Sequence, residues 1–167
     1  DGTIREPVTD DFIKFIRVAD NLPNISAQST SMVPTDIDER LADRYRLYLV
    51  VKYAKKPLIT GAFTTHGVKD MKEMLVAVRE AYGEDLSKKP LAVIDVCPSS
   101  PLMWSEQTAQ HLIDCAQFDI PAEYVSGPLI GATGPASLAG ALVQHTAETL
   151  SGVVLSQLTK AGAPAIW

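Results

Sequence analysis

The segment "PLAVIDVCPSSPLMWS", residues 90–105, determines the fold expected for this chain. Its first seven residues are apolar almost throughout, which is typical of a parallel strand covered on both faces. The loop that follows contains two prolines and the apolar triplet 102–104. It ends at Ser105, whose hydroxyl is suited to cap a helix. A strand, a stiff loop and a helix in this order form one unit of an alternating strand–helix fold.

The same unit recurs on both sides of this segment. Alternating strands and helices predict an α/β fold with a parallel sheet and right-handed crossovers. Neither an internal repeat nor a linker is visible, so residues 1–167 are expected to form a single segment. The expected strands are 25–30, 57–62, 90–96, 122–127 and 163–167, and the expected helices are 9–22, 35–56, 68–82, 105–118 and 135–159.

Two helix details are specific enough to test. Thr35 and Asp38 have the spacing of a capping box at the start of the second helix. The last helix is long, and Gly140 and Gly152 are positions at which it could be broken. A break would let the side chains between these glycines approach a pocket.

Two architectures fit the alternation. A complete doubly wound sheet of five strands suits the length, whereas a (β/α)8 TIM barrel typically needs about 250 residues. The chain ends with "APAIW", a strand without a helix behind it. We therefore expect part of a barrel, with about five strands in sequential order. A doubly wound sheet would instead have the order 2-1-3-4-5.

Composition excludes several classes of function. The chain is 46% hydrophobic and 21% charged with a net charge of −5, and this balance does not favour nucleic acid. Its apolar runs are shorter than the roughly 18 residues of a membrane helix. Cys97 and Cys115 lack metal or redox spacing and are interpreted as reduced thiols of a cytoplasmic protein. The three histidines have no metal-ligand spacing, so no metal site is predicted.

Functional residues of parallel α/β proteins gather at the carboxyl ends of the strands. Asp95 and Trp104 follow the third expected strand, Phe63 follows the second and Ser31 follows the first. Asp95 is a catalytic candidate, and the other three are candidates for substrate binding. Each also has a structural interpretation: Asp95 could bond its own loop, and Trp104 could pack against it.

Residues of the last helix complete the candidate set. A helix break would bring Gln144 to the substrate and His145 to the catalytic centre, although a structural role for His145 is favoured. His111 is expected to be exposed, and Cys97 to be a small buried residue rather than a nucleophile. The glycine-rich segment 127–140 lacks the lysine of a phosphate loop and the spacing of a dinucleotide fingerprint.

Several long stretches resemble the trimethylamine methyltransferase family, which also holds glycine betaine and related quaternary-amine methyltransferases. The match runs in order from about residue 12 to the end. It is specific because many stretches agree. They are "STSMVPTD", "YRLYLVVKYAKKPLITGAFT", "DVCPSSPLMWSEQT", "LIDCAQFDIPAE", "GPLIGATGPASLAGALVQHTAETLSGVVLSQL" and "GAPAIW".

The resemblance implies a (β/α)8 barrel in a chain of nearly 500 residues, of which this sequence is roughly the middle third. It implies methyl transfer from a tertiary or quaternary methylated amine to the Co(I) of a corrinoid (cobalamin), carried by a separate corrinoid protein. The DxHxxG motif of that carrier does not occur here. Trimethylamine members contain a pyrrolysine, at a position expected beyond Trp167. A homo-oligomer is also expected.

A trimethylammonium group donates no hydrogen bonds, so aromatic rings and a carboxylate are suited to recognise it. Asp95 could supply the charge, Trp104 and Phe63 the rings, and the prolines a stiff loop. The competing hypothesis is non-catalytic: an α/β domain that binds a small osmolyte or serves as a scaffold. Methyl transfer to a corrinoid distinguishes the two.

Overall fold

The computed structural model describes residue 2 and residues 4–167, and it contains one five-stranded parallel sheet. The strand order is β1-β2-β3-β4-β5, so neighbours in sequence are neighbours in space. This confirms the predicted sequential order and excludes the order 2-1-3-4-5. Each strand lies inside its expected range but is shorter. The strands are β1 (Gln28–Ser29), β2 (Leu58–Thr60), β3 (Ala92–Val96), β4 (Ala122–Tyr124) and β5 (Ala165–Ile166).

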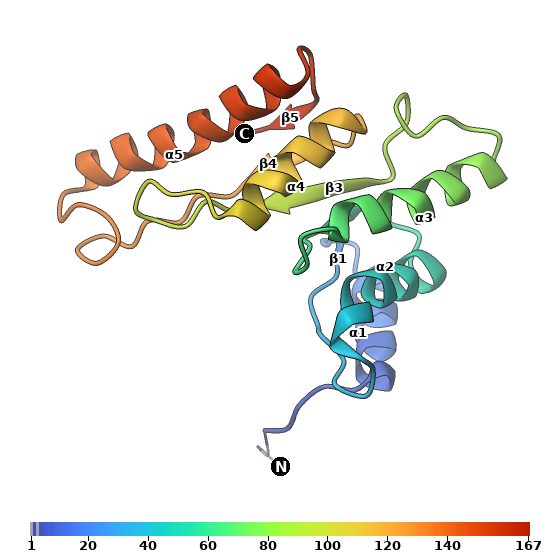
Figure 1. Cartoon of the computed structure of the whole chain (residues 1–167). Coiled ribbons are helices and arrows are strands. Elements are labelled where there is room, and N and C mark those ends of the chain that lie inside the picture. The colour runs from blue at the N-terminus through green and yellow to red at the C-terminus, as the bar shows by residue number, and fades with distance from the viewer. Residues whose placement is uncertain (1, 3) are drawn as a thin grey trace.

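The helices form a row in the same order as the strands (Figure 1). α1 packs against α2, α2 against α3, α3 against α4, and α4 against α5. Such a row places successive helices on one side of the sheet, as right-handed crossovers require. The helices are α1 (Thr9–Asn21), α2 (Ala42–Tyr53), α3 (Gly67–Ala81), α4 (Glu106–Gln117) and α5 (Leu138–Thr159).

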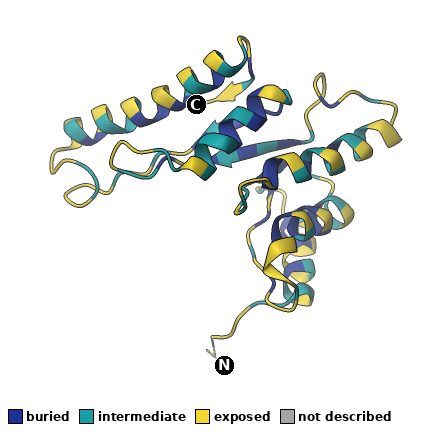
Figure 2. Ribbon diagram, in the orientation of Figure 1, coloured by how far each residue is buried: buried dark blue, intermediate teal, exposed yellow. Residues whose placement is uncertain are grey.

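The two faces of the sheet differ in burial. In β3, Ala92, Ile94 and Val96 are buried, whereas Val93 and Asp95 between them are half-buried. Because side chains alternate across a strand, the buried set faces the helices and the other set faces away. β2 and β4 follow the same alternation. Within the described residues the helices thus cover one face of the sheet, and the other face is half-buried (Figure 2). The expectation that both faces are covered stays a prediction.

The core lies between the sheet and the helix row. It joins Ile94 and the other buried strand residues to fully buried apolar residues of the helices, including Phe12, Leu47, Leu75 and Leu112. Burying a side chain of this size contributes about 1.5–3 kcal/mol. This packing fixes the helices over the strands and thereby aligns the carboxyl ends of β1–β4.

The predicted helix start at Thr35 is wrong. Thr35 instead donates its backbone N–H and its hydroxyl to Pro7 O, which ties the N-terminal segment down. Asp38 accepts a hydrogen bond from Arg40 N and caps a short 3-10 turn, Glu39–Leu41. α2 begins only after that turn. Asp38 therefore serves as a cap itself, for the N–H two residues after it. It is not the second member of a capping box that begins at Thr35.

α5 is continuous for 22 residues, so the predicted breaks at Gly140 and Gly152 are wrong. Gly152 instead permits close packing. A Cβ built there meets Trp104 Cζ2 and Tyr124 Cδ1, each at 2.7 Å. Ser105 does cap α4, as predicted, by accepting a hydrogen bond from Thr108 N at 3.1 Å. Among the residues described, none of the helices is long and apolar enough to span a membrane.

Gly152→Ala should destabilise the protein by about 1–3 kcal/mol, because the added methyl group overlaps two packed rings. Helix propensity alone would favour alanine by about 1 kcal/mol. Denaturant unfolding of the complete polypeptide measures the balance. Gly127→Ala is the matched control, since a Cβ at Gly127 has nothing within 4 Å. Equal stability of the two variants would contradict this packing.

Candidate functional site

The carboxyl ends of β1, β2 and β3 open into a cavity of about 420 Å³. The ends of the strands supply most of its wall, and α2 and α4 supply the remainder. This is the position at which parallel α/β folds bind their ligands. The lining residues are Ser29, Thr30, Arg46, Gly61, Ala62, Phe63, Asp95, Val96, Cys97, Gln107, Thr108 and His111.

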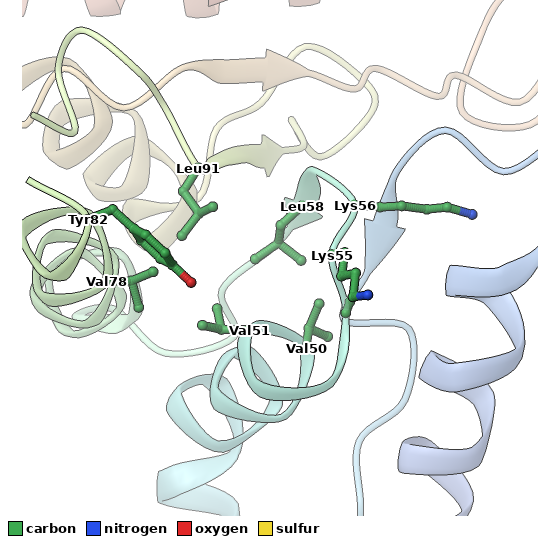
Figure 3. A pocket seen from close by; sticks show the side chains of 9 residues that line it. Val50, Val51, Lys55, Lys56, Leu58, Val78, Tyr82 and Leu91 are labelled. Atoms are coloured by element: carbon green, nitrogen blue, oxygen red, sulfur yellow. The ribbon is translucent and has the colours of Figure 1, made fainter. Parts of the chain in front are cut away.

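A second cavity, of about 300 Å³, lies at the amino ends of β2 and β3 (Figure 3). Val50, Val51 and Leu58 line it together with Tyr82. Lys56 points away from these side chains, and its Nζ donates to Ala19 O and Leu22 O. Parallel α/β folds bind their ligands at the carboxyl ends of the strands rather than at the amino ends. We therefore assign the site to the cavity at the carboxyl ends.

Asp95 lies on the half-buried face of β3, directly opposite Glu123 of β4 in the strand register. In-register neighbours on one face of a sheet lie close together, so two acids meet here. Asp95 Oδ1 is buried without a hydrogen-bond partner among the described residues. Burial, and then the neighbouring Glu123, raise the pKa of Asp95 to about 7. The cavity therefore contains a carboxyl group that titrates near neutral pH.

Arg46 of α2 is a buried cation in the wall of the same cavity. Its Nε donates to Thr30 O at 3.1 Å and to Met32 O at 3.0 Å, and its Nη2 donates to the Thr30 carbonyl and hydroxyl. The Phe63 ring covers the guanidinium, with 4.5 Å between Cζ and the ring centroid. Arg46 thus holds the end of β1, and one face of the Phe63 ring covers the guanidinium group of Arg46.

Asp43, one turn before Arg46, holds the loop after β2. Its carboxylate accepts hydrogen bonds from Phe63 N, Thr64 N and the Thr64 hydroxyl at 2.9–3.0 Å. Charged side chains are seldom fully buried unless they are paired. Sequence reasoning did not identify Asp43 or Arg46, because three charged residues in the first five positions of α2 read as an ordinary solvent-exposed helix start.

Glu148 of α5 holds the two-proline loop between β3 and α4. It accepts hydrogen bonds from Leu102 N at 2.8 Å, from Ser100 Oγ at 2.8 Å, and also from Ser126 Oγ and Gln144 Nε2. Leu102 has a φ of 53°, a left-handed conformation that costs a non-glycine residue about 1–3 kcal/mol. The hydrogen bonds to a buried glutamate, which the sequence analysis did not identify, thus tie this loop to α5, and its stiffness stays a prediction.

The hydrogen bonds keep Glu148 ionised. Burial raises the pKa of its carboxyl group, but the bonds from Leu102, Ser126, Gln144 and Ser100 together lower this pKa to about 2. A carboxylate with this many donors is stabilised in its charged form. Glu148 is thus a fixed anchor and does not exchange protons near neutral pH.

The structure brings together two of the six predicted site residues, Asp95 and Phe63. Trp104 lies outside their cavity: its Nε1 donates to Ser151 Oγ at 2.9 Å, and its ring packs at Gly152. Gln144 donates to Glu148 and to Thr133 O rather than pointing into the cavity. The expectation that Trp104 shares a cavity with Asp95 is therefore wrong, and the substrate-binding roles of Asp95 and Phe63 remain predictions.

Ser31 and His145 also lie apart from the cavity. Ser31 is exposed beyond its rim, where Ser29 and Thr30 supply the wall instead. His145 lines a separate hollow with Pro128 and Leu142. Because α5 is unbroken, nothing in the helix geometry moves His145 toward Asp95. The catalytic role predicted for His145 therefore lacks the helix break on which it depended.

Two further expectations are corrected. His111 is buried, not exposed, and its Nε2 lies 2.8 Å from Thr64 O. Cys97 is exposed at the cavity, not buried, and like Cys115 it is a free thiol. Partial desolvation of the thiol, followed by Asp95 and Glu123, raises the pKa of Cys97, which disfavours the nucleophilic thiolate. Within the described part of the chain, no cluster of three or more His, Cys, Asp or Glu side chains could hold a metal ion.

The fold and the cavity define a parallel α/β protein whose candidate site lies at the carboxyl ends of sequentially ordered strands. The model of the trimethylamine methyltransferase (MTTB) family matches residues 1–167. The chain therefore belongs to the trimethylamine methyltransferase family.

Named relatives agree with this assignment. The chain is 32% identical to the trimethylamine methyltransferase MttB of Desulfitobacterium hafniense over 98% of its own length and 33% of the relative. It is 44% identical to MttB of Methanosarcina barkeri over 54% of its length and 19% of the relative. It is 26% identical to the proline betaine:corrinoid methyltransferase of Eubacterium limosum over 100% of its length and 36% of the relative. The chain thus spans about a third or less of these proteins.

Glu148→Gln should lower the free energy of unfolding by about 1–3 kcal/mol at pH 7, because an amide cannot accept every hydrogen bond that the carboxylate accepts. The folded pKa of about 2 lies below the ordinary value of 4.5. The stabilisation is therefore complete above pH 4.5 and disappears as the pH falls toward 2.

The free energy of unfolding of wild type and Glu148→Gln, measured between pH 2 and pH 7, tests this pH dependence. The difference between them should shrink in acid. Glu73→Gln is the control, since the Glu73 side chain is 72% exposed and pairs only with Lys72 among the described residues. A difference that persists unchanged at pH 2 would show that the stabilisation does not depend on the charge of Glu148, and an equal effect at Glu73 would show that the Glu148 hydrogen bonds do not contribute to it.

Proposed function

We propose that the protein transfers a methyl group from a tertiary or quaternary methylated amine, such as trimethylamine or glycine betaine, to the Co(I) of a corrinoid bound by a separate protein. The family match over residues 1–167 carries this proposal. The name of the Eubacterium limosum relative, a proline betaine:corrinoid methyltransferase, supports the corrinoid acceptor. A methylated amine is accordingly the substrate, and a corrinoid protein is the partner.

The proposed scaffold is a (β/α)8 barrel, of which residues 1–167 form one segment. Two features support it: the parallel strands follow sequential order, and the helices of the described residues lie in one row over one face of the sheet. In a barrel the other face, with Val93, Asp95 and Glu123, is the interior. The cavity beside Asp95 then lies at the top of the barrel, where a partner protein can approach.

The residues of the cavity fit a reaction whose nucleophile comes from outside the chain. When bound, the corrinoid supplies that nucleophile. The Cys97 thiol is disfavoured as one by its raised pKa. Asp95 can balance the positive charge of the ammonium group, and Phe63 offers an aromatic ring at the same wall. The contribution of the chain is then alignment of the methyl group and exclusion of water.

The titration of Asp95 gives this proposal a pH dependence. With a pKa of about 7, Asp95 is protonated and neutral in acid and becomes a carboxylate as the pH rises. Binding of tetramethylammonium, which does not titrate, should therefore tighten between pH 6 and pH 8. Asp95→Asn should bind about tenfold more weakly at pH 8 and lose most of this dependence. Isothermal titration calorimetry on the complete polypeptide measures both.

Methyl transfer from trimethylamine or glycine betaine to free cob(I)alamin, followed spectroscopically, tests the activity itself. Asp95→Asn should slow the reaction at pH 8, whereas Glu73→Gln on the exposed surface of α3 should not. Binding of a methylated amine without any methyl transfer would favour the competing hypothesis of an osmolyte-binding domain. Equal rates for wild type and Asp95→Asn would place the site elsewhere.

A further inference from the structure

The last helix, α5, differs from the other helices in what it exposes to solvent. Within Leu138–Thr159 every exposed residue except Ser151 is apolar. α3, by contrast, exposes charged residues such as Lys69, Glu73 and Glu80. A helix that is apolar on all sides is typical of a buried position, and an exposed apolar surface marks a site of interaction. The exposed side of α5 thus has the composition of an interface, although no described residue covers it.

Five residues define the outer face of α5: Val143, Ala147, Leu150, Val154 and Leu158. They follow one another in steps of four, three, four and four residues, so they lie on one side of the helix. Their exposed fractions reach 71% at Val143 and 81% at Leu158. The opposite side of α5 is buried against β4 and α4, and exposed residues recur along the whole helix in Figure 2. The outer face therefore points away from the sheet and from α4.

The spacing along the outer face is that of a helix pair. Steps of four and three residues form the seam of a coiled coil, in which side chains of one helix fill gaps on the other. Such a gap is present on α5. A shallow groove of about 440 Å³ is lined by Val143, Ala147 and Leu150 together with Leu142 and Thr146. The small Ala147 lies between two larger side chains, so a branched side chain of a second helix can fill the groove.

The order of residues on the outer face is symmetric about its midpoint. Ala147 and Val154 lie equally far from this midpoint, and so do the two end residues. In an antiparallel pair of identical helices, Val154 of each copy therefore meets Ala147 of the other. A two-fold contact between identical subunits requires this reciprocity. The outer face is thus complementary to itself.

The charges of α5 do not oppose such a pairing. Glu148 is the only Asp, Glu, Lys or Arg within Leu138–Thr159. Its buried carboxylate accepts hydrogen bonds from Ser100 and Leu102 and lies away from the outer face. Helices that bind a membrane surface are rich in Lys and Arg, and α5 contains neither. This composition favours a protein partner over a lipid surface.

The position of the outer face disfavours two other occupants. Successive helices of the row pack side by side, so a helix that continued the row beyond α5 would contact its flank and not the outer face. A protein that delivers a corrinoid has to reach the cavity at the carboxyl ends of the strands. The outer face instead points away from the sheet over the length of α5 (Figure 1).

We infer that the outer face of α5 binds the outer face of a second copy of the polypeptide, with the two helices antiparallel. Leu150 lies near the centre of this contact, and Ala147 of each copy accommodates Val154 of the other. At 1.5 Å per residue, the 22 residues of α5 provide a seam about 33 Å long. The inference concerns assembly and does not depend on the proposed methyl transfer.

Sedimentation of the complete polypeptide tests the contact. Wild type should sediment as a dimer or as an assembly with an even number of copies. Val154→Lys introduces a charge into the apolar seam and should raise the dissociation constant at least about tenfold, giving species of half the mass. Val18→Lys is the matched control, because Val18 is 61% exposed on α1 and lies outside this face. A wild type that is monomeric or odd-numbered, or equal effects of the two variants, would overturn the inference.

A pair of charges tests the antiparallel order. Ala147→Glu alone should weaken the assembly as Val154→Lys does. Combined in one chain, the two substitutions place a carboxylate of each copy beside an ammonium group of the other. The double variant should therefore associate at least about tenfold more tightly than either single variant. Within one chain the two positions are about 10 Å apart, too far for a direct pair.

The matched control for the charge pair carries Ala147→Lys with Val154→Lys, which places like charges in the seam and should stay dissociated. A double variant of opposite charges that dissociates as readily as this control would overturn the antiparallel pairing.

Stability and lipid binding identify other occupants, once circular dichroism has shown that each variant is folded. A loss of unfolding free energy in Val154→Lys at unchanged mass would show that another segment of the same polypeptide covers the outer face. Binding of wild type, but not of Val154→Lys, to vesicles of phosphatidylcholine and phosphatidylserine would show a lipid surface instead. Either result overturns the inference.

Discussion

Two buried charges on one turn of α2 hold the carboxyl ends of the first two strands in position. Asp43 accepts hydrogen bonds from the loop after β2, and Arg46 donates to the end of β1. Removing one member of such a pair leaves an uncompensated buried charge, which costs about 3–5 kcal/mol. The cavity wall at Thr30 and Phe63 therefore depends on this pair, because both residues are positioned by it.

The same device recurs on the other half of the sheet. Glu148 of α5 accepts hydrogen bonds from the loop after β3, at Ser100 and Leu102, and from Ser126 after β4. In both places a helix supplies charged side chains, two from α2 and one from α5, that satisfy polar groups of two successive loops. Loops of this kind cannot bury an apolar core of their own, so their order must come from the helix layer. The carboxyl edge of the sheet, although it is built from irregular segments, is thus held by hydrogen bonds to the helices.

The sequence predicts the fold of this chain better than its site. Strand positions and order follow from apolar runs and crossovers, and the Ser105 cap follows from residues close together in sequence. The helix start at Thr35 was wrong because Asp38 caps a 3-10 turn first. Asp95 and Phe63 each follow a strand, and parallel strands end at the same edge of a sheet. Their shared cavity was therefore predictable from the sequence.

The remaining site residues depend on contacts that no local pattern encodes. The Glu148 carboxylate meets Leu102 across 46 positions, and Arg46 meets Thr30 across 16. Trp104 was predicted as a cavity wall because of its place after a strand, yet Gly152 provides the groove into which its ring packs. A glycine in a helix signals close approach, but not which partner approaches. Which residues meet in such long-range contacts follows only from the three-dimensional packing of the helices against the sheet.

The carboxyl pair of Asp95 and Glu123 links stability to binding. The pKa of Asp95 in the folded state, about 7, lies above its ordinary value of 3.8. The folded state therefore keeps a proton that the unfolded state releases, and stability falls as the pH rises from about 4 to about 7. Burial of the carboxylate causes most of this loss, and the neighbouring Glu123 adds to it. In the proposed function, the positive charge of an ammonium group near Asp95 favours the ionised form and thus the release of the proton. The acid pair that weakens the fold at neutral pH is thus suited to the cationic substrate proposed for this site.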